Sequence, residues 1–99
     1  MTLETKPFDM ANHLKTEAEM ADFLSAAFEE EDPAYIAHAL GVVARAHGMS
    51  QLSKETGLTR ESLYKALSDD GNPTLSTLTK VMKAMGMRVT VQAAPVQAV

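Results

Sequence analysis

The sequence has 99 residues, of which 45% are hydrophobic and 22% are charged, and it contains no cysteine. This length suits one domain with a packed core and leaves no room for a multidomain enzyme. The lack of cysteine excludes disulfides, thiol catalysis and the common structural zinc sites, and no apolar run reaches the ~18 residues that a membrane span needs. We therefore expect a cytoplasmic protein without membrane spans or a secretory signal.

The formal net charge of −4 is the sum of two unlike halves. Residues 1–32 hold nine acidic and two basic side chains, a net charge of −7, whereas residues 33–99 hold seven basic and four acidic side chains, a net charge of +3. Uneven surface charge is common in small domains. The alternative interpretation is that two surfaces serve two different partners.

The N-terminal third of the chain predicts a lead-in followed by one helix. Residues 1–15 have no clear period, and Pro7 and Asn12 discourage regular structure, so we expect a mobile or partner-dependent segment. Thr16 is a suitable N-cap, and Glu19 three residues later completes a capping box. Apolar residues then recur at helical spacing, which predicts an amphipathic helix; they are Met20, Phe23, Leu24, Ala27 and Phe28.

Four further helices are predicted between residues 33 and 85. Asp32 and Pro33 are typical of a helix start, and this helix is expected to run to about Ala46, with Gly48 as its cap. Short helices are expected over 50–56, 60–68 and 75–85. Their predicted N-caps are Ser50, Thr59 and Thr74. The last helix is expected to bury Leu75, Leu78, Val81, Met82 and Met85.

Residues 87–93 alternate between apolar and polar side chains, which predicts a half-buried strand. No other strand is expected in the chain, and an isolated strand leaves its backbone groups unpaired. We expect it to pair with the same strand of a second copy across a two-fold axis, through Met87, Val89 and Val91. Pairing with residues 2–8 and simple disorder are the alternatives.

Residues 49–68, MSQLSKETGLTRESLYKALS, have the spacing of a helix-turn-helix. Small Ser53 allows a close helix crossing, Gly57 can adopt a positive φ in the turn, and Leu58 follows as a buried plug. With Leu63 and Leu67 toward the core, the second helix is expected to present base-reading side chains to the DNA major groove; these are Arg60, Glu61, Ser62, Tyr64 and Lys65. The candidate phosphate contacts are Ser50, Gln51, Lys54, Thr59, Asn72 and Thr74.

The charges on this helix also have an interpretation that needs no DNA. Glu61 and Lys65 are four residues apart, and such a pair stabilises any exposed helix by a few tenths of a kcal/mol. The wider sequence decides between the two interpretations.

The run SQLSKETGLTRESLYKALSDDGNPTLSTLTKVMKAMGMRVTV resembles the Xre-like DNA-binding antitoxins of type II toxin–antitoxin modules, in particular the HigA-like group of addiction-module antidote proteins. The resemblance covers about residues 30–93, and its most distinctive pieces are TGLTRESLYKALS, DGNPTLSTL and MGMRVTV. It implies an all-α, five-helix repressor-like domain and a homodimer that binds a palindromic operator in its own promoter. It also implies a cognate small basic toxin of the RelE/ParE superfamily.

The expected organisation has three parts: an acidic N-terminal segment with its additional amphipathic helix (1–31), a helix-turn-helix DNA-binding domain (32–86), and a C-terminal strand and tail (87–99). A basic toxin suits the acidic segment, through charge complementarity and apolar burial. The candidate toxin-binding residues are Glu17, Asp22, Phe23, Glu29 and Glu30. The alternative is that the apolar stripe of this helix packs on the domain core.

Neither catalysis nor a bound metal or cofactor is expected. His13, His38 and His47 lack metal-ligand spacing, and the acidic runs 29–32 and 69–70 lack a matching base. The predicted function is that of a non-enzymatic antitoxin that neutralises its toxin and represses its own operon. A stand-alone phage-type repressor, and a toxin-binding module without useful DNA affinity, are the alternatives.

Overall fold

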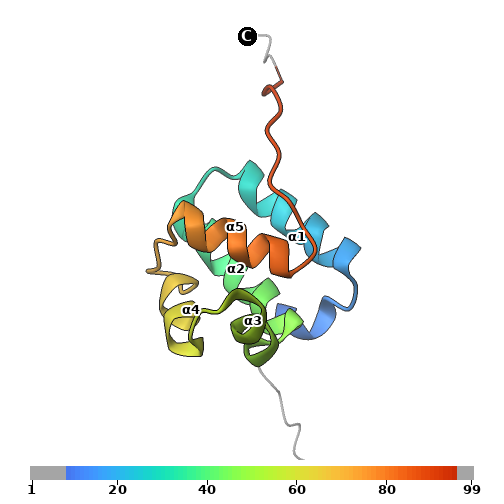
Figure 1. Cartoon of the computed structure of the whole chain (residues 1–99). Coiled ribbons are helices and arrows are strands. Elements are labelled where there is room, and N and C mark those ends of the chain that lie inside the picture. Colours follow the sequence, from blue (N-terminus) through green and yellow to red (C-terminus); the bar gives the residue numbers. More distant parts are fainter. Residues whose placement is uncertain (1–8, 96–99) are drawn as a thin grey trace, which may run out of the picture.

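A computed structural model describes residues 9–95, and this part of the chain is helical, as predicted (Figure 1). A 3₁₀ helix, η1 (Met10–His13), precedes five α-helices: α1 (Glu17–Glu29), α2 (Pro33–His47), α3 (Met49–Thr56), α4 (Arg60–Ala66) and α5 (Leu75–Ala84). Helix α2 packs against η1, α1 and α3, and α3 in turn packs against α4 and α5. None of the helices in this range is long and apolar enough to cross a membrane.

The starts of α1 and α2 follow the predicted capping chemistry. The Thr16 hydroxyl accepts a hydrogen bond from the Glu19 N–H and donates one to the Glu19 carboxylate, both at 3.1 Å. The Asp32 carboxylate accepts from the Ala34 N–H at 3.1 Å, and Pro33 occupies the first turn of α2. These side chains satisfy backbone donors that have no partner inside the helix.

Helix α3 begins differently from the prediction. Gly48 is its N-cap, no side chain caps it, and the predicted N-cap Ser50 lies inside its first turn. The buried side chain of Met49 brings the first residue of α3 against the core. Packing of that side chain, rather than a capping hydroxyl, therefore determines where α3 starts.

A single apolar core runs through all five α-helices, and its most deeply buried members include Ala39, Leu40, Val43, Leu52, Leu63, Val81 and Met85. The apolar stripe of α1 joins this core, since Leu24 and Ala27 are buried and Phe23 is partly buried against it. Leu75 is an exception: it was expected to be buried, but 78% of it is exposed. It occupies the first position of α5, one turn before the partly buried Leu78, so the apolar spacing continues beyond the region of contact.

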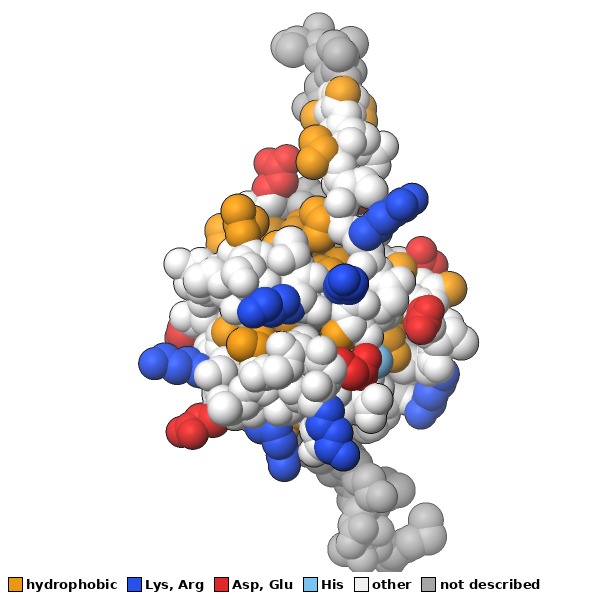
Figure 2. Space-filling view, viewed as in Figure 1, with side chains coloured by type: hydrophobic (Ala, Val, Ile, Leu, Met, Phe, Trp, Pro, Cys, Tyr) orange, Lys and Arg blue, Asp and Glu red, His pale blue; other side chains and the backbone are white. Residues whose placement is uncertain are grey.

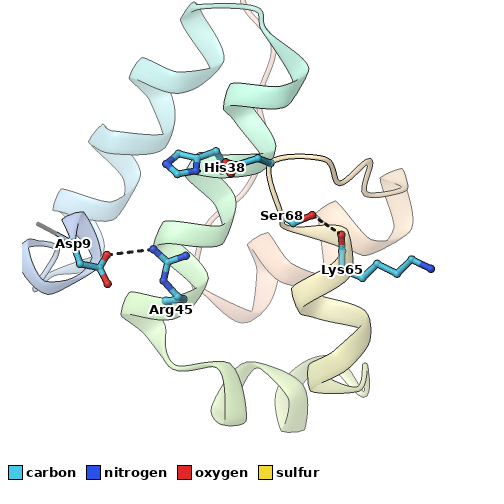
Figure 3. Close-up of polar contacts among 6 residues, drawn as sticks. Asp9, His38, Arg45, Lys65 and Ser68 are labelled. Carbon is cyan, nitrogen blue, oxygen red and sulfur yellow. Dashed lines mark hydrogen bonds and ion pairs between the residues drawn. The ribbon is translucent and has the colours of Figure 1, made fainter. Parts of the chain in front are cut away.

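The lead-in is more ordered than expected from residue 9 onward. The Asp9 carboxylate accepts from the Ala11 N–H at 3.1 Å and pairs with the Arg45 guanidinium of α2 at 3.2 Å (Figure 3). Leu14 is buried in the core. This segment is therefore attached to α2, through contacts between residues that are 36 positions apart. The proposed pairing partner at residues 2–8 lies outside the described residues.

The predicted C-terminal strand is not formed within this chain. Residues 87–95 have no regular secondary structure and extend away from the helices (Figure 1). Met87 packs against the core, but Val89 is 49% exposed and Val91 is 97% exposed. A strand needs a neighbour for its backbone groups, and the described part of one chain provides none. The predicted strand is thus not seen in residues 87–95, and its pairing across a dimer stays a prediction.

Candidate nucleic-acid interface

Two hydroxyls fix the turn between α3 and α4. The Ser53 hydroxyl donates to the Leu58 carbonyl at 2.6 Å, and the Thr56 hydroxyl donates to the Leu52 carbonyl at 2.7 Å while accepting from the Leu58 N–H at 3.2 Å. Gly57 lies between Thr56 and Leu58 with φ 76° and ψ 4°, the left-handed conformation expected of it. The Ser53 side chain therefore stabilises the turn with a hydrogen bond, in addition to its small size.

Helix α4 presents the predicted base-reading side chains to solvent. Its N-cap is Thr59, whose hydroxyl accepts from the Ser62 N–H at 3.0 Å. Leu63 is fully buried and Leu67, at the C-cap, is also buried, as the helical spacing requires. All five base-reading candidates are exposed on the remaining surface; they are Arg60, Glu61, Ser62, Tyr64 and Lys65. Figure 3 shows the Lys65 side chain pointing away from the body of the domain.

The six candidate phosphate contacts are also exposed, and most lie at the beginnings of helices. Ser50 and Gln51 are in the first turn of α3, and Thr74 is the N-cap of α5, where its hydroxyl accepts from the Thr77 N–H at 3.1 Å. Backbone N–H groups and the helix dipole favour phosphate at such positions. Lys54 lies in the last turn of α3, at the opposite end from Ser50. The remaining two candidates are Thr59, before α4, and Asn72, in the connection to α5.

The C-terminal end of α4 is held against α2 by contacts that sequence reasoning missed. A Cβ atom added to Gly41 of α2 would lie well inside 3.0 Å of the Leu67 carbonyl oxygen, so the two backbones touch there. Beside them, His38 Nδ1 lies 2.6 Å from Asp69 Oδ1, and the Ser68 hydroxyl donates to the Lys65 carbonyl at 3.1 Å (Figure 3). Asp69 follows His38 by 31 residues, and no periodic signal in the sequence connects them.

The candidate toxin-binding residues lie on a different part of the molecule, because α1 packs on α2 rather than on α4. Glu17, Asp22, Glu29 and Glu30 are exposed. Asp22 and Glu29 are seven residues apart and therefore share one outer face of α1. Phe23 differs from the four acids, since its side chain is partly buried against the core. The structure thus leaves an acidic surface here, with little of the apolar stripe exposed.

Three polar contacts within residues 9–95 join an acidic side chain to a histidine or an arginine. His47 Nε2 lies 3.0 Å from Glu55 Oε1, and this hydrogen bond lowers the pKa of Glu55 below its ordinary value. The Ala11 N–H and then Arg45 lower the pKa of Asp9 in the same way. Within this range no three His, Asp or Glu side chains come together as metal ligands would.

Comparison with known proteins gives the chain a family. Residues 4–93 match the family described as "Probable addiction module antidote protein", a match that includes all five α-helices. An uncharacterized protein of Haemophilus influenzae is 47% identical over 92 residues, which span 93% of this chain and 95% of that protein. No solved structure matches the chain. The chain therefore belongs to the family of probable addiction module antidote proteins, the antitoxins of toxin–antitoxin modules.

Proposed function

We propose that this antitoxin is an Xre-like, HigA-like repressor that binds the operator of its own operon as a homodimer and neutralises a RelE/ParE-superfamily toxin. One observation supports DNA binding above all: α4 buries Leu63 and Leu67 while its five base-reading candidates are exposed together. In this proposal the segment from α3 to α4 acts as a helix-turn-helix. The dimer places two copies of α4 in successive major grooves, about one DNA turn or ~34 Å apart.

The proposed division of labour follows the donors and acceptors on each side chain. Arg60 and Lys65 donate to guanine, Glu61 accepts from the amino group of cytosine, and Ser62 serves either role. Ser50 and Thr74, at the N-terminal ends of α3 and α5, contact phosphates and set the register of α4 in the groove.

The toxin surface in this proposal is the acidic outer face of α1. Glu17, Asp22, Glu29 and Glu30 are exposed and carry no paired Lys or Arg within residues 9–95. A small ribosome-directed toxin is expected to be basic, so charge complementarity steers the encounter. Phe23 packs on the core and stabilises α1 from the inner side.

A salt series on a duplex from the gene's own promoter tests the DNA half of the proposal. Phosphate-led binding weakens steeply as salt rises, with a slope of about 0.9 for each phosphate neutralised. We expect Lys65→Ala and Arg60→Ala to reduce operator affinity about 5- to 150-fold, while the matched control Lys15→Ala leaves it unchanged. Equal affinity for operator and unrelated DNA would remove the repressor role and favour a toxin-binding module instead.

Co-expression with the neighbouring open reading frame tests the toxin half. We expect the chain to relieve the toxicity of a small basic neighbour, and the double variant Asp22→Lys/Glu29→Lys to lose that relief while still binding the operator. Operator binding without relief of any neighbour's toxicity would favour a stand-alone phage-type repressor.

A further inference from the structure

An open groove with unpaired positive charge lies between α3 and α5, outside the surfaces already assigned. Its volume is about 480 Å³, and it is lined by Glu55 and Thr56 of α3 and by Lys80, Lys83 and Ala84 of α5. Both lysines are exposed, and in residues 9–95 neither has a carboxylate within 4.0 Å. Glu55 is already held by His47. Figure 2 shows basic side chains lying across α5 on this face.

This groove lies at the C-terminal end of α3, away from most of the residues assigned to the proposed DNA interface. Glu55 and Thr56 are the last residues of α3, whereas the phosphate candidates Ser50 and Gln51 are in its first turn. The phosphate candidate Lys54 is in the last turn but does not line the groove. An eight-residue helix is about 12 Å long. None of the residues lining the groove belongs to α4. An acidic protein surface can pair with the two lysines of this groove.

The same chain carries a hollow of the opposite charge at the turn between α1 and α2. Glu30, Asp32 and Tyr35 line an open hollow of about 220 Å³. Within the described range no Lys or Arg lies within 4.0 Å of these carboxylates, and the residue Tyr35 is 42% exposed. Two carboxylates beside an aromatic ring suit an ammonium group, which gains both charge pairing and a cation–π contact.

We propose that, in the dimer, Lys80 and Lys83 of each copy dock against the Glu30–Asp32–Tyr35 hollow of the other copy. This inference rests on the homodimer of the proposed function. A contact between two unlike patches forms twice across a two-fold axis, so both grooves and both hollows are filled and the assembly closes at two copies.

The contact has a defined consequence for the dimer. Exposed ion pairs contribute little affinity singly and mainly set orientation and salt sensitivity. In a symmetric dimer each substitution alters both copies of this contact. Glu30 also belongs to the proposed toxin surface, so a bound toxin and this contact compete for the same side chain.

A charge exchange followed by sedimentation of the full chain tests the contact. At about 50 mM salt we expect Lys83→Glu and Glu30→Lys each to raise the dimer Kd about tenfold, and the double variant to return to within about threefold of wild type. The matched control Lys15→Glu has the same change in charge as Lys83→Glu and is expected to keep the wild-type dimer Kd. At about 500 mM salt the wild type and all four variants should have the same dimer Kd.

Three outcomes would overturn the inference without touching the proposed dimer. The first is an equal dimer Kd for Lys83→Glu and Lys15→Glu at low salt, and the second is a double variant no tighter than the single ones. The third is a loss of operator affinity in Lys83→Glu with an unchanged dimer Kd, which would identify the lysine as a phosphate contact. A wild-type chain that stays monomeric at every concentration would refute the proposed dimer itself, and this contact with it.

Discussion

Replacing Gly41 by alanine is expected to destabilise the fold, although the same exchange stabilises an ordinary helix. Alanine is favoured over glycine by about 1 kcal/mol in an open helix interior. At Gly41, however, the new Cβ would lie well inside 3.0 Å of the Leu67 carbonyl oxygen. That oxygen belongs to the backbone and cannot rotate away, so α2 and the end of α4 must separate.

The magnitude follows from these two opposing effects. Overpacking costs about 1–3 kcal/mol, and contact with a rigid backbone atom places this case at the upper end. After the gain in helix propensity, we expect a net loss of about 2 kcal/mol in the free energy of unfolding. A domain of this size loses about 4–8 °C in Tm for each kcal/mol. Since Leu67 is the C-cap of α4, operator affinity should fall as well.

Thermal and urea unfolding followed by circular dichroism measure this effect. Ala26→Gly, at an exposed position of α1, is the matched control, because it reports the propensity difference without a clash. We expect Ala26→Gly and Gly41→Ala both to lower the Tm, even though they are opposite exchanges. A Gly41→Ala variant that melts at or above the wild-type temperature would refute the proposed backbone contact between α2 and α4.

Three further predictions concern the same region. Thr59→Ala removes the hydroxyl that caps Ser62 and should cost about 1 kcal/mol in urea unfolding, whereas Thr59→Ser should retain most of the stability. Leu63→Ala leaves a cavity at a fully buried position and should cost about 2–5 kcal/mol; a smaller loss would mean that α4 is loosely packed. Because the pKa of Glu55 is lowered in the folded state, its contact with His47 stabilises the fold at neutral pH and is lost as the pH falls below 4.5. Glu55→Gln should therefore make the urea midpoint depend less on pH over that range. A pH dependence equal to that of wild type would contradict this.

Local chemistry was enough to predict where most helices start. Thr16, Asp32, Thr59 and Thr74 cap α1, α2, α4 and α5 as their sequence neighbours suggested. A capping hydroxyl or carboxylate acts within three residues, so the sequence records it directly. The outward face of α4 follows for a similar reason, since Leu63 and Leu67 fix its rotation at helical spacing.

Contacts between distant residues explain what the sequence did not reveal. Asp9 and Arg45 are 36 residues apart, and His38 and Asp69 are 31 residues apart, so neither pair has a local signature. The C-terminal segment shows a related difficulty. Its alternation indicates a strand, but strand formation depends on a neighbour that one copy of the chain does not supply.

Few side chains of α4 are buried, so the residues that stabilise the fold differ from those that α4 exposes to a partner. Leu63 is the one fully buried side chain of the seven-residue helix α4. Leu67, the residue that follows the helix, is also buried. The five outward positions contribute nothing to the interior, so substitutions there alter the readable surface at small thermodynamic cost. Under the proposed DNA-reading role of α4, members of this family can thus diverge in the sequences that they recognise while retaining one scaffold, and paralogues in a single cell can be kept from regulating one another's genes.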